Sequence, residues 1–271
     1  MVEPNPGGRA EARLKTYVIN LPDAVRRRRL IEAQLVHFPF LDVEFFTAVR
    51  GADLAAEEID RLADHAHSER HLGRRLTLSE IGCALSHLEI YGLMESAHVA
   101  QAMILEDDAI VSGMLHAFFP RLLAAFRSER PRILLLTPCK YMINGGRRVD
   151  EDYAIRPMYD ASSTTGYMIN VAAARILRGA LLPLYTVADS WVEIRRSTGM
   201  RIETLVPYCI GISYSKNTAS TVQATAGTET SRSAPAVHAA RVHQRVGGLL
   251  RRAARGLFER AFGIKAHRVI F

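Results

Sequence analysis

The sequence predicts an α/β fold with a mixed, mainly parallel central sheet, because its opening segments read as strand, helix and strand. Residues 14–20 form an apolar, β-branched run that ends in Asn-Leu-Pro, which is typical of a strand entering a turn. Residues 40–46 form a second such run, and apolar positions at helical spacing lie between the two runs. The chain has 271 residues, enough for one sizeable core.

The later elements follow from periodicity and from helix and turn signals. Asp23 is expected to cap the first helix, which carries the run Arg26–Arg29. Thr77 and Glu80 resemble a capping box that opens a helix running to about Glu95. We further predict a helix-prone stretch at 51–71, strands at 99–105, 132–136 and 201–210, helices at 116–126 and 173–182, and a loop-rich stretch at 139–165 with a hairpin at Asn144-Gly145-Gly146.

Charge and composition divide the chain into a near-neutral body and a basic end. The formal net charge is +7, and from Arg232 onward nine lysines and arginines stand against one acidic residue. We predict a flexible N-terminus at 1–13, one catalytic domain at 14–214, a linker or disordered loop at 215–236, and a basic amphipathic helical tail at 237–271. Such a tail can bind an anionic membrane surface, and a solvated tail is the alternative.

Several classes of protein are disfavoured by the sequence. The three cysteines lie far apart without a CxxC pair, so a zinc knuckle or a disulfide framework is not expected. The sequence shows neither a secretory signal nor an apolar run of about 18 residues, so we expect a cytoplasmic protein, peripheral on the inner face of the membrane if the tail binds there. It also lacks a recognisable nucleic-acid module, so nucleic acid is not an expected partner.

The acidic triplet Glu106-Asp107-Asp108 directly follows the strand predicted at 99–105, where open α/β sheets bind their ligands. Because side chains alternate along a strand, Glu106 and Asp108 are expected to point one way and Asp107 the other. Adjacent carboxylates repel one another unless a cation lies among them, and Mn²⁺ or Mg²⁺ prefers such oxygen ligands. A metal-diphosphate site is one interpretation, and a solvated acidic turn is the other.

Four blocks of the sequence occur in the order found in a known enzyme family. They are Tyr17-Val-Ile-Asn-Leu21 with Arg27-Arg28, Leu78-Ser-Glu-Ile-Gly-Cys-Ala-Leu-Ser-His87, Ile104-Leu-Glu-Asp-Asp108 and Thr165-Gly-Tyr-Met-Ile169. Together they resemble glycosyltransferase family 25, the bacterial lipopolysaccharide and lipooligosaccharide glycosyltransferases, which are similar to β-1,4-galactosyltransferases.

This resemblance implies a GT-A-like, Rossmann-type fold that binds a nucleotide sugar. It also implies an inverting transfer of a sugar, typically galactose, from a UDP-sugar to an oligosaccharide or lipid-linked glycan acceptor in lipopolysaccharide or other surface-glycan biosynthesis. Mn²⁺ or Mg²⁺ would be held by Glu106 and Asp108. The donor-side candidates are Asn20, Leu21, Arg27, Arg28, Ser86, His87, Glu106, Asp107, Gly166 and Tyr167.

An inverting transfer needs a general base for the acceptor hydroxyl. Asp189 lies where the family has an acidic residue after the Gly-Tyr block, and Glu193 is its rival, four residues later. The segment around Asp189 is shortened and altered relative to the family, and a third metal ligand is not identified.

Some of these residues have plainer interpretations. A helix cap is the plainer interpretation of Asp189, and a solvated face is that of the arginine run. Ser86 and His87 are adjacent on a helix, so their side chains diverge and do not form a nucleophile-base pair. Two other functions remain open: a catalytically silent relative that acts as a membrane-associated binding protein, and a metal-dependent phosphoesterase, which would need more ligands.

Overall fold

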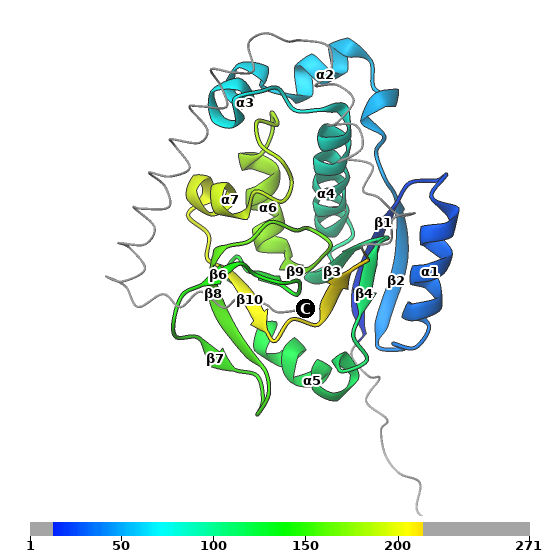
Figure 1. Cartoon of the computed structure of the whole chain (residues 1–271), viewed down its shortest axis with the longest axis vertical. Coiled ribbons are helices and arrows are strands. Elements are labelled where there is room, and N and C mark those ends of the chain that lie inside the picture. The colour runs from blue at the N-terminus through cyan, green and yellow to red at the C-terminus, as the bar shows by residue number, and fades with distance from the viewer. Residues whose placement is uncertain (1–12, 214–271) are drawn as a thin grey trace, which may run out of the picture.

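A nine-stranded mixed sheet organises residues 13–213, the part of the chain that the computed structural model describes (Figure 1). The strand order is β2-β1-β3-β9-β5-β10-β8-β6, and β7 also pairs with β8. A separate two-stranded sheet pairs β11 with β4. The strands are β1 (Leu14–Asn20), β2 (Leu41–Thr47), β3 (Gln101–Glu106), β4 (Ala109–Val111), β5 (Ile133–Leu135), β6 (Tyr141–Met142), β7 (Arg147–Arg148), β8 (Ala154–Asp160), β9 (Gly166–Asn170), β10 (Ile202–Val206) and β11 (Ile210–Ile212).

The direction of the strands confirms the predicted mixed, mainly parallel sheet. β1 pairs in parallel with both β2 and β3, and β10 pairs in parallel with β5. β9 lies antiparallel between β3 and β5, and β8 lies antiparallel to β10, β6 and β7. Within this sheet, β8 and β9 are thus the strands that run against the others.

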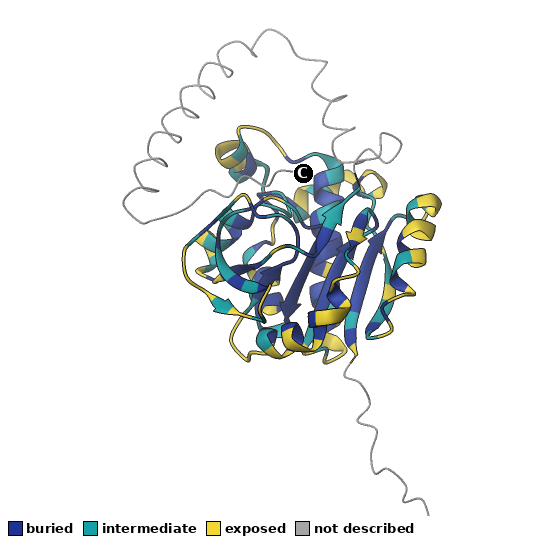
Figure 2. Ribbon diagram, turned by 60° about the horizontal axis from the view of Figure 1, so that its bottom comes forward, coloured by how far each residue is buried: buried dark blue, intermediate teal, exposed yellow. Residues whose placement is uncertain are grey.

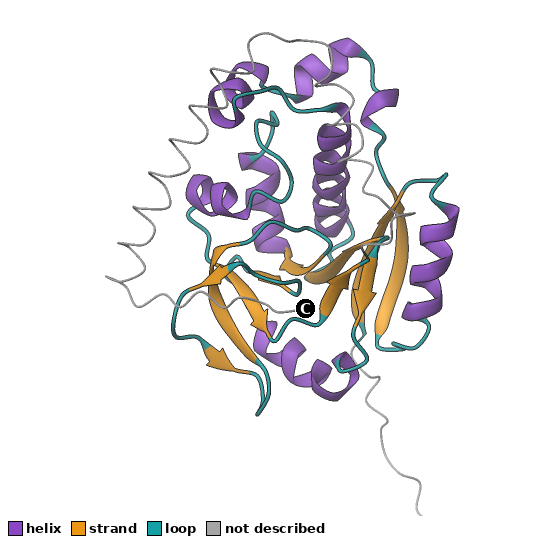
Figure 3. Ribbon diagram, viewed as in Figure 1, coloured by secondary structure: helices purple, strands orange, loops and turns teal. Residues whose placement is uncertain are grey.

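Helices cover both faces of the sheet (Figure 3). They are α1 (Val25–Leu35), the 3₁₀ turn η1 (Gly51–Asp53), α2 (Ala56–Leu62), α3 (His65–Leu72), α4 (Leu78–Ser96), α5 (Leu115–Phe126), α6 (Val171–Ala180) and α7 (Trp191–Thr198). Buried side chains of α1 and α5 share one apolar cluster, and those of α4, α6 and α7 share another.

Alternation along the central strands assigns each side chain to one of these two clusters. On β1, Tyr17 and Ile19 pack toward α4 and α6, whereas Val18 packs toward α1 and α5. On β3, Ile104 joins the first cluster and Met103 joins the second. The central strands are therefore buried on both sides, as Figure 2 shows.

The helix ends test the capping residues that the sequence predicts. Thr77 and Glu80 form the predicted capping box, and α4 runs to Ser96, one residue past the predicted end. The predicted cap at Asp23 is wrong: α1 begins after Ala24 without a side-chain cap, and Asp23 instead pairs with Arg50. Among the helices of the described range, none is long and apolar enough to span a bilayer.

Asn170 joins two distant segments at the end of β9. Its side-chain oxygen accepts hydrogen bonds from the backbone N–H groups of Ala173 and Arg132, and so caps α6. Its amide nitrogen donates to the backbone oxygens of Ser128 and Arg130. One side chain thereby satisfies four main-chain groups.

The stretch 139–165 contains more structure than the predicted loop. It holds β6, β7 and the seven-residue β8. Gly145 and Gly146 do adopt positive φ, but the strands on either side of them pair with β8 rather than with each other, so the predicted hairpin is wrong. The predicted linker at 215–236 and basic tail at 237–271 lie outside the described residues.

Candidate active site

A cavity of about 240 Å³ opens where β1, β2 and β3 end. Its lining comes from segments that are far apart in the sequence. They are the end of β1 and its connection (Ile19, Leu21), α1 (Arg27), the segment after β2 (Ala48–Ala52), α4 (Ser79, Cys83, Ser86, His87) and the triplet (Glu106, Asp107, Asp108). The position agrees with ligand binding at the carboxyl ends of parallel strands.

All three residues of the triplet line this cavity. β3 ends at Glu106, and Asp107 and Asp108 form the turn into β4. Glu106 contacts His87 of α4 and Asp107 contacts Arg27 of α1, and these helices cover opposite faces of the sheet, as the predicted alternation expects for these two residues. Asp108 lies in the turn, beyond the extended backbone on which that prediction depends. The three carboxyl groups are close enough that the charges of Glu106 and Asp107 disfavour ionisation of Asp108.

Asp107 is fixed by contacts with β1 and α1. Its Oδ2 accepts a hydrogen bond of 2.6 Å from Asn20 Nδ2, and its Oδ1 lies 3.3 Å from Arg27 Nε. Burial raises the pKa of Asp107, although Arg27 and Asn20 act in the opposite direction. Asn20 thus serves the site by holding Asp107, and Arg27 is held at the cavity wall.

Glu106 is flanked by His87 and Thr164. His87 Nε2 lies 3.6 Å from Glu106 Oε1, and the Thr164 hydroxyl donates to the same oxygen. Burial acts to raise the pKa of Glu106, but His87, Thr164 and Arg27 together hold it below its ordinary value. Glu106 is therefore ionised at neutral pH.

Asp108 has the fewest stabilising contacts of the three acidic residues. Burial, followed by the charges of Glu106 and Asp107, raises the pKa of Asp108 to about 7. Its buried Oδ1 has no hydrogen-bond partner among the described residues. A buried, unpartnered oxygen beside two other carboxylates suits a hard divalent cation, so the residues present fit such an ion.

Two tyrosines orient His87 through a chain of hydrogen bonds to its Nδ1 atom. Its Nδ1 lies 2.8 Å from the Tyr167 hydroxyl, which lies 2.7 Å from the Tyr91 hydroxyl. Both tyrosines are buried, and Tyr167 is fully so. Of the two positions that the sequence allows for Tyr167, against the donor or in the core, the structure shows the core, and Tyr167 reaches the cavity only through His87.

The remaining donor-side candidates divide between the cavity and the scaffold. Leu21 lines the cavity. Ser86 lines it too, with its hydroxyl bonded to Val49 N and Gly82 O. Arg28 does not line it, because its guanidinium pairs with Glu32 and lies over the Phe45 ring. Gly166 serves packing: a Cβ there would come within 2.7 Å of Ile210.

The two candidate bases have different surroundings. Asp189 is not the cap of α7, which begins after Ser190. Burial, then the charge of Glu106, raises the pKa of Asp189, which places it in the electrostatic range of the triplet. Glu193 is turned toward α3, with its carboxylate 3.8 Å from His71 Nε2 and 3.5 Å from the Tyr185 hydroxyl. Neither residue lines the cavity.

Sequence reasoning missed two features of the site. Gly51 and Gly82 bring the segment after β2 against α4, since a Cβ on Gly82 would come within 2.5 Å of Val49 O. Cys83 faces the cavity beside His87, one helical turn before it. The spacing of four residues between Cys83 and His87 on a predicted helix was the available signal for that pair.

Known proteins similar to this chain point to one family. Residues 13–192 match the sequence profile described as "Glycosyltransferase family 25 (LPS biosynthesis protein)". A "Glycosyltransferase 25 family member" of Anopheles gambiae is 34% identical over 193 residues, which cover 66% of this chain and 31% of that protein. "Procollagen galactosyltransferase 1" of Danio rerio is 25% identical over 199 residues, with the same two coverages.

The chain spans about a third or less of the length of the curated relatives it matches. Among solved structures, the inositol-1-phosphate CTP transferase of T. maritima is 12% identical with a TM-score of 0.39, and the match covers 83% of this chain and 98% of that one. A similarity of that degree carries no argument about function here.

Proposed function

Because the chain belongs to glycosyltransferase family 25, we propose that it transfers a sugar from a UDP-sugar to a glycan acceptor, with a divalent cation bound at the acidic triplet. The observation that carries this proposal is that three consecutive acidic residues line one cavity and that the buried Asp108 Oδ1 is unpartnered among the described residues. The name of the Danio rerio relative supports galactose as the sugar.

In the proposed site, Glu106 and Asp108 would hold Mn²⁺ or Mg²⁺, which would supply positive charge to stabilise the diphosphate leaving group. Arg27, positioned by Asp107, faces the phosphates with a guanidinium that matches their oxygens. The cavity of about 240 Å³ is smaller than the roughly 300 Å³ of the smallest usual ligand pockets, so it takes part of the donor.

Asp189 is the proposed general base for the acceptor hydroxyl in an inverting transfer. Its raised pKa makes it a stronger base than an ordinary aspartate, and Glu106 contributes to that rise. Glu193 is the second choice because its carboxylate already contacts Tyr185 and His71.

The acceptor and setting follow from the family as further parts of this proposal. We propose an oligosaccharide or lipid-linked glycan acceptor and a role in lipopolysaccharide or other surface-glycan biosynthesis in the bacterial cytoplasm. Membrane docking through the basic tail would be tested by sedimentation with anionic liposomes, and removal of residues 237–271 should abolish it.

The deciding experiment incubates the purified full chain with a panel of UDP-sugars, with and without Mn²⁺, and measures UDP release and thermal protection by the donor. Asp108→Asn should reduce the metal-dependent response by roughly 100-fold or more, since loss of outer contacts alone costs 10–100-fold at metal sites. Asp42→Asn is the matched control, because Asp42 pairs with Lys15 and lies outside the cavity.

Each outcome has a distinct meaning. Donor binding without transfer to any acceptor would indicate a catalytically silent binding protein. Release of phosphate from simple phosphate esters without sugar transfer would indicate a phosphoesterase. An unchanged metal response in Asp108→Asn would refute the role assigned to Asp108.

A further inference from the structure

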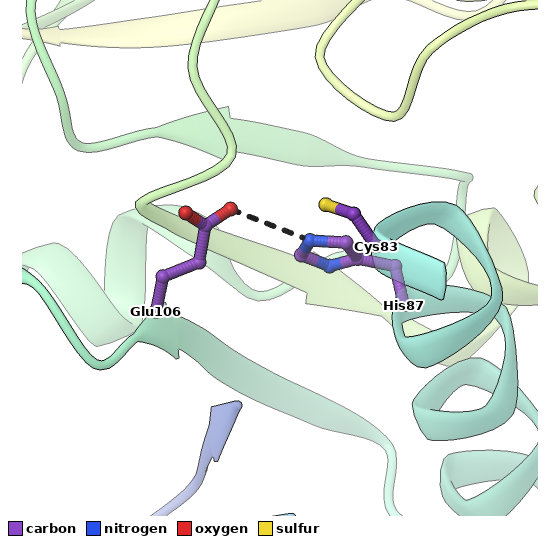
Figure 4. A group of neighbouring side chains, drawn as sticks. All are labelled: Cys83, His87 and Glu106. Carbon is purple, nitrogen blue, oxygen red and sulfur yellow. Dashed lines mark ion pairs between the residues drawn. The ribbon is translucent and has the colours of Figure 1, made fainter. Parts of the chain in front are cut away.

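Three side chains with different metal preferences converge on the cavity wall behind the acidic turn. Cys83 Sγ, a ring nitrogen of His87 and a Glu106 oxygen all lie within 4.8 Å of one another, and His87 Nε2 lies 3.6 Å from Glu106 Oε1. Figure 4 shows the thiol and the imidazole on one side of α4, both facing the carboxylate that ends β3. We propose that these three residues form a binding site for a thiophilic divalent cation such as Zn²⁺.

The chemistry of the ligand set selects the class of ion. One thiolate, one imidazole and one carboxylate suit Zn²⁺ or Co²⁺, whereas Mg²⁺ and Mn²⁺ prefer an all-oxygen set. Zinc bonds of about 2.0–2.3 Å place tetrahedral ligand atoms roughly 3.5 Å apart. The 3.6 Å separation of His87 and Glu106 already meets this spacing, and the Cys83 sulfur lies within 4.8 Å of both partners.

Neighbouring hydrogen-bonding groups orient His87 for metal binding. Its side chain is buried, and Nε2 has no hydrogen-bond partner in the described part of the chain. Binding through Nε2 requires the proton to be on Nδ1, and the Tyr167 oxygen can accept that proton's hydrogen bond because Tyr167 can donate its own to Tyr91. Outer partners of this kind fix the tautomer and orientation of metal-binding histidines.

Binding requires one proton to leave. The Cys83 thiol would lose its proton to solvent as the sulfur–metal bond forms, whereas Glu106 is already ionised and the imidazole would keep its proton on Nδ1. Solvent reaches the site because all three residues line the cavity. Three protein ligands leave a fourth position of the tetrahedron for water.

Glu106 belongs both to this site and to the proposed donor-metal site. A thiophilic ion would take an oxygen that the proposed Mn²⁺ needs, so the two ions should compete. This consequence rests on the proposed function, whereas the cation site itself does not, because it can be measured without nucleotide.

Cobalt titration of the full chain without nucleotide tests the site. Bound Co²⁺ should give a thiolate-to-cobalt charge-transfer band, which Zn²⁺ should remove and excess Mg²⁺ should not. The chain contains three cysteines, and the other two, Cys139 and Cys209, are buried in the core. Cys83→Ser should therefore abolish the band and weaken Zn²⁺ binding about tenfold or more, while Cys209→Ala should retain both.

A second measurement uses the unaltered chain, in case a variant fails to fold. Zn²⁺ should protect Cys83 from alkylation, as read by mass spectrometry of its peptide, and Mg²⁺ should not. A missing band in the unaltered chain, a band retained in Cys83→Ser, or unprotected Cys83 at saturating Zn²⁺ would overturn the proposal. Glycosyl transfer enters none of these readouts, so the proposed function can fail separately.

Discussion

Replacing Gly82 by alanine tests how closely α4 is packed against the segment that lines the cavity. A Cβ at this position would lie 2.5 Å from Val49 O and 2.6 Å from Gly51 N, both of them backbone atoms. Overpacking of this kind costs roughly 1–3 kcal/mol, with rigid backbone neighbours at the upper end. Alanine gains about 1 kcal/mol over glycine within a helix, so we expect Gly82→Ala to lose about 1–2 kcal/mol.

Gly92 provides the matched control on the same helix. A Cβ there would come within 3.3 Å of the Arg178 guanidinium, the flexible end of a side chain, which can move aside. Gly92→Ala should therefore keep most of the gain of about 1 kcal/mol from helix propensity. The two variants should differ by about 2–3 kcal/mol in their free energy of unfolding.

Thermal and urea unfolding would measure this difference. For a domain of this size, 1 kcal/mol shifts Tm by about 2–4 °C, so the two variants should melt roughly 5–10 °C apart. Gly82→Ala should also weaken donor binding, because Val49 and Gly51 line the cavity. Equal stability of the two variants would show that the fold tolerates a wider separation between α4 and this segment.

Two further substitutions concern buried carboxylates. Glu203→Ala should lower the free energy of unfolding by about 3–5 kcal/mol in urea, since Arg132 and Arg147 both pair with Glu203, whose side chain is 3% exposed. A loss under 1 kcal/mol would contradict this. Glu80 has a lowered pKa, because its bonds with Arg74 and Thr77 outweigh burial. The stability gap between wild type and Glu80→Gln should therefore be largest at neutral pH and shrink as the pH falls through the folded pKa, whereas a pH-independent gap would exclude this linkage.

Local sequence signals predicted those parts of the fold that depend on local physics. The capping box at Thr77 and Glu80 uses two residues three positions apart, and it correctly marked the start of α4. The run before Glu106 correctly placed a buried strand ahead of the triplet. The parallel pairing of β1 with β2 followed from the short helical connection between them.

The parts that were missed depend on partners distant in the sequence. β8 was taken for loop because its burial comes from pairing with β10, more than forty residues later. The hydrogen bond between Asn20 and Asp107 joins residues 87 positions apart.

The four main-chain bonds of Asn170 make its side chain a link between two segments that are not neighbours in sequence. The turn at 128–132 and the first turn of α6 share that single amide, so neither can open without breaking contacts of the other. Their backbone amides should consequently exchange with solvent as one cooperative unit. Partial unfolding would then release the segment that leads into β5 and the start of α6 together. Both lie at the end of the sheet opposite the cavity.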